Sequence, residues 1–156
     1  TWESTASLWA CSSANANIVY HAAGWMEGGL CASFEKFVID CELLQQMSYY
    51  HRPVSVTEDD LAVEAIRDVG STGHFLGADH TQTRYKSAFY SPFLSDWSNF
   101  ENWEQAGAVE TPRRANRIFR EVLARYQSPP MDEATTEALG DYVARRKSEG
   151  GAPTDF

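Results

Sequence analysis

A chain of 156 residues with 43% hydrophobic residues is long enough for one domain, or for part of a larger one, and too apolar to be intrinsically disordered. Its 22 acidic residues outnumber its 13 basic ones, and the formal net charge of -9 disfavours nucleic acid and anionic lipid while favouring a cationic ligand or a basic partner. The cysteines, Cys11, Cys31 and Cys41, form no CxxC pair, so reduced thiols in a cytoplasmic protein are the simplest interpretation. No stretch approaches the roughly 20 apolar residues that span a bilayer.

The first 50 residues predict a strand between two helices. Residues 3–14 have the small-residue, weakly amphipathic pattern of a closely packed helix. The β-prone run Ile18–Tyr20 predicts a strand over residues 18–22, followed by a glycine-rich loop. Residues 32–50 then repeat apolar side chains at helical spacing, namely Phe34, Phe37, Val38, Cys41, Leu44 and Met47. A strand, a glycine-rich loop and a long helix make one βα unit, and in an α/β barrel such a loop faces the active site.

The middle of the chain predicts a capped helix and then an irregular arm. Thr57 and Asp60 have the spacing of a capping box, and Gly70 is a suitable stop for the helix that they begin. Residues 71–98 are rich in His, Gly and aromatic residues and predict irregular structure. We interpret the dense aromatic cluster from Tyr85 to Trp103 as an ordered irregular arm held against a larger body, with a surface for docking a partner as the alternative.

Further helices are expected toward the C-terminus. Asn99 caps a short helix that ends at Gly107, Thr111 begins the next, and the last is centred on residues 139–143, before a frayed tail from Gly150. One strand cannot form a sheet by itself. The chain is therefore either nearly all-α, or the rest of its sheet lies outside it. The glycine-rich loop favours the second alternative.

The main candidate site begins at His21. A histidine at the carboxyl end of a strand can donate a hydrogen bond, accept one, or carry charge near neutral pH. The face of Trp25 attracts ammonium cations, and Glu27 can balance their charge. The structural alternative is a histidine that satisfies a backbone carbonyl, a core tryptophan and a solvated glutamate, and spacing alone favours this alternative.

Two other groupings contain residues of the kinds that bind metals. His74, Asp79 and His80 lie in a glycine-rich segment that predicts no helix, and turn hydrogen bonds explain them as well as a metal does. The thiols and His21 lack a zinc-binding spacing. Cys41 lies on the apolar face of its predicted helix, as buried structural cysteines do. The sequence therefore predicts no metal site.

Two long motifs, in this order, resemble those of a known family. Residues 21–44, HAAGWMEGGLCASFEKFVIDCELL, are similar to the HxxGW-[LM]-E-x-G-L stretch and following helix of the trimethylamine methyltransferase family, although Cys31 stands where Thr is common. Residues 68–96, DVGSTGHFLGADHTQTRYKSAFYSPFLSD, resemble the family's second signature and its aromatic-rich arm. The downstream segments NFENWEQAG and RANRI fit the family's C-terminal end, so the resemblance covers residues 2–147.

The resemblance implies an α/β fold in which this chain is the C-terminal part of a (β/α)8 TIM barrel. The chain itself would be mostly α-helical, with about one short strand and an irregular aromatic-rich arm. Residues 1–50 would form the last βα unit or units, and residues 51–156 a helical extension packed on the barrel. We therefore expect Ile18, Tyr20 and Leu8 to be unusually exposed in this chain alone, because the neighbouring strands are missing.

The resemblance also implies an activity: transfer of a methyl group from trimethylamine, or from a quaternary amine such as glycine betaine, to the Co(I) of a corrinoid held on a separate protein. The expected partners are a corrinoid (cobalamin) protein and a small methylated amine, with no nucleic acid, no membrane and no directly bound cofactor. His21 matches a family position that lines the substrate cavity, and Leu30 lies near another. With Trp25 and Glu27 they form the expected substrate site, in which His21 is also the catalytic candidate.

Other classes of function stay open. The chain is alternatively a non-catalytic barrel remnant, a helical binding module that docks a corrinoid protein, or a purely structural helical domain. A C-terminal portion by itself is expected to be inactive. The sequence leaves the oligomeric state open, a homo-oligomer included. It also leaves open the methyl donor, because the position at which some members carry pyrrolysine falls before Thr1.

Overall fold

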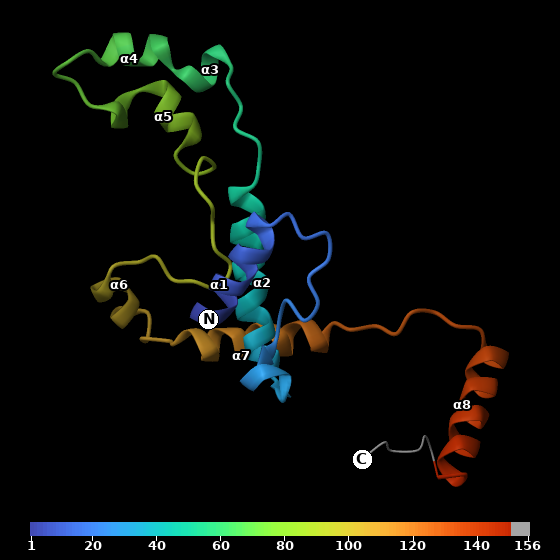
Figure 1. The fold of residues 1–156 in the computed structure, drawn as a ribbon. Helices are drawn as coiled ribbons and strands as arrows, with labels where there is room; N and C mark the ends of the chain where they lie inside the picture. Colours follow the sequence, from blue (N-terminus) through green and yellow to red (C-terminus); the bar gives the residue numbers. More distant parts are fainter. Residues whose placement is uncertain (151–156) are drawn as a thin grey trace. The chain divides into compact units, whose positions relative to one another are not determined.

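The computed structural model describes residues 1–150, which are mostly helical and contain a two-stranded sheet (Figure 1). The chain divides into two compact units, Thr1–Leu123 and Ala124–Phe156. The described residues confirm the mostly helical composition. They do not form a barrel, so the barrel and the division at residue 50 stay predictions.

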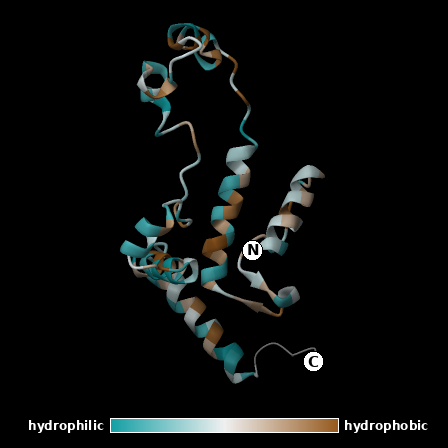
Figure 2. Ribbon diagram, turned by 90° about the vertical axis from the view of Figure 1, so that its left-hand side faces the viewer, coloured by the Kyte–Doolittle hydropathy of each residue, from teal (hydrophilic) through white to brown (hydrophobic). Residues whose placement is uncertain are grey.

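Two helices of the first unit pack against each other. Helix α1, Trp2–Ser13, packs against α2, Phe34–Tyr50, which is the longest helix of the described residues, as predicted. The backbone N–H of Lys36 donates to the Ser33 hydroxyl at 3.2 Å, so Ser33 caps the start of α2. Figure 2 shows hydrophobic and hydrophilic residues alternating along this helix.

The predicted strand over residues 18–22 is wrong. The strands are β1, Trp25–Met26, and β2, Cys31–Ala32, which pair antiparallel around the single turn of 3-10 helix η1, Glu27–Gly29. The φ angle of His21 is +55°, a left-handed conformation that a strand cannot continue through. The β-prone side chains therefore lie in an irregular loop instead.

The predicted exposure of three apolar residues is partly confirmed. Ile18 and Tyr20 are 75% and 83% exposed, as expected for side chains without strand neighbours. The prediction for Leu8 is wrong, since this side chain is only 7% exposed. Helix α1 packs on α2 within the chain itself, so Leu8 needs no other partner for its burial.

The apolar core joins α2 to α7, Thr111–Ala124, through the end of the aromatic-rich arm. Val38, Leu94 and Ala115 are buried together, with partly buried neighbours Ile39, Ile118 and Phe119 packed against them. The buried Glu42 carboxylate accepts hydrogen bonds from the backbone N–H groups of Leu94, at 2.8 Å, and Ser95, at 2.9 Å. This carboxylate therefore fixes the segment that carries Leu94 into the core.

The middle segment confirms the capping box and shows a helix that we did not predict. The Thr57 hydroxyl accepts from Asp60 N–H at 3.1 Å, while Asp60 accepts from Thr57 N–H at 3.0 Å. The expected helix is broken by a left-handed Ala62. It forms two pieces, α3 at Glu58–Leu61 and α4 at Val63–Val69, before the stop at Gly70. The turn η2, Phe75–Gly77, and the short helix α5, Asp79–Arg84, follow in a segment predicted to be irregular.

Residues 85–98 form the ordered arm that the sequence predicts. They contain no strand, and two hydrogen bonds join them to α2 in addition to those that Glu42 accepts from Leu94 and Ser95. Tyr49 donates its hydroxyl proton to the Ala88 carbonyl at 2.9 Å, and Tyr90 donates to the Gln45 side chain at 2.9 Å. The arm is thus fixed against the chain's own longest helix.

Two of the C-terminal helices begin where the sequence predicts, one after Asn99 and one at Thr111. Asn99 caps α6, Phe100–Gln105, by accepting from Asn102 N–H at 2.9 Å. In the second unit, α8, Glu133–Ser148, contains the predicted residues 139–143, and its cap, Asp132, was not predicted. The tail predicted to fray begins at Gly150, and residues 151–156 lie outside the described residues.

Replacing Leu94 with Ala tests the core. We expect the free energy of unfolding to fall by about 2–5 kcal/mol, because the variant loses burial of a Leu side chain and leaves a cavity. Urea denaturation of the whole protein measures this. Leu76→Ala is the control, since Leu76 is 73% exposed. A Leu94 variant as stable as this control would contradict the assigned core.

Candidate functional site

The candidate site is the loop of residues 21–29, held between α1 and α2. Gly24 is central to it, with φ of +86°, and a Cβ added at Gly24 would lie 3.2 Å from Phe37 Cβ, so only glycine fits without strain. The Gly24 N–H donates to Asp40 Oδ2 at 2.9 Å, and its carbonyl accepts from Ser33 N–H at 3.0 Å. The loop conformation is therefore fixed through both backbone polar groups of this one residue.

Aromatic rings on this loop lie against one another. The ring centroids of His21 and Trp25 are 4.7 Å apart with an interplanar angle of 45°, and the Tyr20 ring lies 6.2 Å from that of His21. Trp25 is 41% exposed, so part of its ring remains available to a ligand. Trp25 is the ring that the sequence predicts for binding an ammonium group, and the His21 and Tyr20 rings extend its aromatic surface.

The structure brings three of the four predicted site residues together. His21, Trp25 and Glu27 line one cleft of about 350 Å³, whose other wall is α1. Leu30 does not line this cleft and is 88% exposed, so its predicted place in the site is not supported. Glu3 and Asp40 add carboxylates to the lining. The arrangement suits a small cation with methyl groups, which binds to aromatic faces and is balanced by nearby carboxylates.

The buried ion pair under the loop was missed by sequence reasoning. Asp40 is 1% exposed, and Lys36 Nζ lies 2.5 and 2.6 Å from its two carboxylate oxygens. The same Nζ donates to the Ser4 hydroxyl of α1 at 2.7 Å. The sequence did contain a signal for this pair. Lys36 and Asp40 have i,i+4 spacing on the predicted helix, and Asp40 adjoins the apolar stripe of that helix.

Neither grouping considered for a metal is assembled as a ligand set. Within residues 1–150 no three His, Cys, Asp or Glu side chains lie close enough together to hold a metal ion. His80 Nε2 lies 2.8 Å from the Asp59 carbonyl oxygen and is engaged in that hydrogen bond. Burial raises the pKa of the Cys41 thiol, which disfavours the thiolate that a metal would require.

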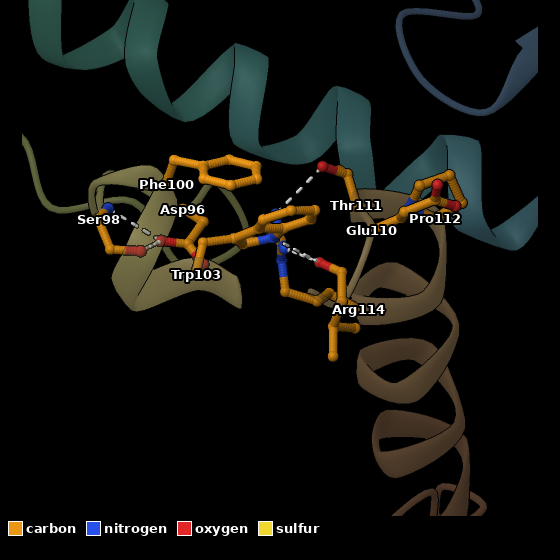
Figure 3. Close-up of a pocket in the computed structure, with 9 residues that line it drawn as sticks. Asp96, Ser98, Phe100, Trp103, Glu110, Thr111, Pro112 and Arg114 are labelled. Atoms are coloured by element: carbon orange, nitrogen blue, oxygen red, sulfur yellow. Dashed lines mark hydrogen bonds between the residues drawn. The ribbon is translucent and has the colours of Figure 1, made fainter. Parts of the chain in front are cut away.

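A second hollow lies between α6 and the start of α7 (Figure 3). Its polar groups satisfy one another: Asp96 accepts from Ser98 N–H at 2.9 Å, and Arg114 donates to Thr111 Oγ1 at 3.1 Å and to the carbonyl of Leu94 at 2.9 Å. The hydrogen bonds from Ser98, the side-chain one above all, lower the pKa of Asp96. The bond from Arg114 to Leu94 connects α7 to the arm, and we assign the hollow a structural role.

Comparisons with known proteins place the chain in a family. Residues 1–151 match the family described as Trimethylamine methyltransferase (MTTB). The chain is 34% identical over 150 residues to the glycine betaine methyltransferase of Desulfitobacterium hafniense strain Y51, covering 96% of this chain and 31% of that protein. It is 32% identical to the trimethylamine methyltransferase MttB of Desulfitobacterium hafniense strain DCB-2, covering 88% of this chain and 27% of that protein.

A further relative is the trimethylamine methyltransferase MttB2 of Methanosarcina mazei, which is 32% identical over 88% of this chain and 28% of its own length. The chain therefore belongs to the trimethylamine methyltransferase family, which confirms the assignment made from the motifs. It spans less than a third of the length of these curated relatives. In the part of the chain that the structure describes, none of the helices is both long and apolar enough to cross a membrane.

Proposed function

We propose that this chain is the C-terminal part of a methyltransferase that moves a methyl group from trimethylamine, or from a quaternary amine such as glycine betaine, to the Co(I) of a corrinoid carried by a partner protein. Family membership supports the reaction class, and the relatives' names supply the two donors. The structural observation that carries the proposal is the cleft in which the Trp25 and His21 rings lie 4.7 Å apart beside Glu27.

In this reaction the protein has little to do beyond binding and orienting the methyl donor and the acceptor. The acceptor supplies the electron pair for the new bond to the methyl carbon, while the pair of the broken C–N bond stays on the departing nitrogen. A quaternary amine, or trimethylamine in its protonated form, therefore leaves as a neutral amine. The protein must align donor and acceptor and exclude water. In this proposal, Trp25 and His21 bind the methylated nitrogen, and Glu27 balances its charge. The cytoplasmic location stays a prediction, and the oligomeric state stays open.

Methyl transfer by the whole protein tests the proposal. The protein is mixed with a Co(I) corrinoid and with either trimethylamine or glycine betaine, and loss of the Co(I) absorbance is followed. We expect one of the two donors to be demethylated, with release of dimethylamine or dimethylglycine in proportion to the Co(I) consumed. A folded protein that demethylates neither donor would overturn the proposal and favour the non-catalytic docking module.

Trp25→Leu tests the cation site by itself. We expect it to weaken binding of tetramethylammonium by about 2- to 30-fold, the equivalent of the ~0.5–2 kcal/mol of a cation–π contact. Trp25→Phe keeps an aromatic face and should retain most of the affinity. Titration calorimetry of the whole protein measures both.

The control for this experiment is Trp97→Leu, because Trp97 lies on the arm and not in the cleft. Equal losses of tetramethylammonium affinity at Trp25 and Trp97 would contradict a specific role for the Trp25 ring.

A further inference from the structure

One ion pair connects three segments of the chain beneath the candidate site. Asp40, in the middle of α2, accepts from Gly24 N–H at 2.9 Å and binds the Lys36 ammonium at 2.5 Å. Lys36 in turn donates to Ser4 on α1 at 2.7 Å. The loop is thus joined to α2 by the almost fully buried Asp40, and α1 is joined to α2 by its partner Lys36.

A buried ion pair is poorly explained by stability alone. Removing two charges from water carries a desolvation cost, and well-packed apolar residues in the same place are often neutral or stabilising. The Lys36 and Asp40 side chains are 14% and 2% exposed, so this cost applies to the pair. Such a pair is better explained if it holds the neighbouring backbone in one defined conformation.

The backbone of residues 21–29, next to the Lys36–Asp40 pair, needs to be held in this way. His21 and Glu27 are both left-handed, at φ of +55° and +51°, a conformation that costs energy for residues other than glycine. Gly24 lies between them and directly precedes Trp25. Holding the Gly24 N–H therefore sets the approach of the Trp25 and His21 rings to each other.

We propose that Asp40 is a positioning residue for the amine site: with Lys36 it fixes Gly24, and through Gly24 the His21–Trp25 ring pair that receives the methylated nitrogen. Asp40 itself need not touch the substrate. The expected loss of kcat/KM rests on the proposed function, whereas the expected effect on the conformation of the loop does not. It adds a residue to the site that the His21–Leu30 motif does not contain.

The test compares Asp40→Ala with Glu42→Ala in the whole protein. Both carboxylates are buried on α2, but Glu42 holds residues 94–95 and not the loop. We expect Asp40→Ala to speed amide hydrogen exchange of residues 21–29 and to lower kcat/KM for the accepted amine by ~10-fold or more, the loss of one buried hydrogen bond to a charged group. Glu42→Ala should lower thermal stability but leave both readouts unchanged.

A conservative double variant completes the test. Lys36→Met with Asp40→Asn removes both charges but keeps the size of the side chain and an oxygen that can accept from Gly24 N–H, so we expect it to restore slow exchange and most of kcat/KM. If Asp40→Ala does not fold, Asp40→Ser replaces it, because its hydroxyl is too short to reach the same donor.

The outcomes test separately the positioning role of Asp40, its link to the amine, and the proposed function. Unchanged exchange of residues 21–29 in the Asp40 variant, or equal changes in the Glu42 variant, would overturn the positioning role. Faster exchange with unchanged kcat/KM would overturn its link to the amine. A wild-type protein that transfers no methyl group would instead overturn the proposed function, and exchange alone would then decide whether Asp40 positions the loop.

Discussion

Replacing His21 with Ala is expected to lower kcat/KM for methyl transfer by about ten- to a hundredfold. The variant loses the ring that lies 4.7 Å from Trp25 and, with it, a hydrogen-bonding group for the carboxylate of glycine betaine or the N–H of protonated trimethylamine, a contact worth about 1.5–3 kcal/mol. Steady-state kinetics with the whole protein, a Co(I) corrinoid and the accepted amine measure the effect.

The matched control is His51→Ala. His51 is also an exposed histidine beside aromatic rings, but it lies at the end of α2, where its Nε2 is 2.5 Å from Ser12 Oγ. Its replacement should leave kcat/KM unchanged. A folded His21 variant with wild-type kcat/KM would show that His21 has only a structural role.

Replacing Lys36 with Met should lower the stability of the protein strongly. The Asp40 carboxylate would remain buried without its cation, and breaking a buried pair in this way costs about 3–5 kcal/mol. We expect a corresponding fall in the free energy of unfolding, measured by urea denaturation. The double variant Lys36→Met with Asp40→Asn should recover much of this loss, because no uncompensated charge is left.

The exposed pair of Arg67 and Glu64 supplies the contrast. Its N–O distance of 2.5 Å equals that of the buried pair, but its side chains are 67% and 79% exposed. Arg67→Met is therefore expected to cost only about 0–1 kcal/mol. Equal losses in the Lys36 and Arg67 variants would contradict the buried environment assigned to Lys36 and Asp40.

Local signals in the sequence predicted most of the helices, but neither the break at Ala62 nor the short helix α5. The apolar stripe over residues 32–50 predicted α2, and the capping pair Thr57 and Asp60 forms as expected. These features depend on neighbours within a few residues, and a single sequence contains that information. The failure at residues 18–22 has the opposite cause, because β-branched side chains favour a strand only where a second strand is available to pair with it.

The candidate site was partly predictable because most of its residues are close together in the sequence. His21, Trp25 and Glu27 are close in sequence and line one cleft, whereas Leu30 does not line it. Asp40 was missed because a charged residue within a helical pattern is ordinarily taken as solvent-exposed. Its burial depends on the packing of α1 and the loop against α2, which local spacing does not encode.

The location of a bound amine tests the central claim most directly. In a crystal structure of the whole protein with trimethylamine or glycine betaine, whichever it demethylates, we expect the methylated nitrogen within about 6 Å of the Trp25 ring centroid, in the cleft beside His21. An amine bound at a site that includes none of residues 21–29 would contradict the assignment of this loop as the substrate site.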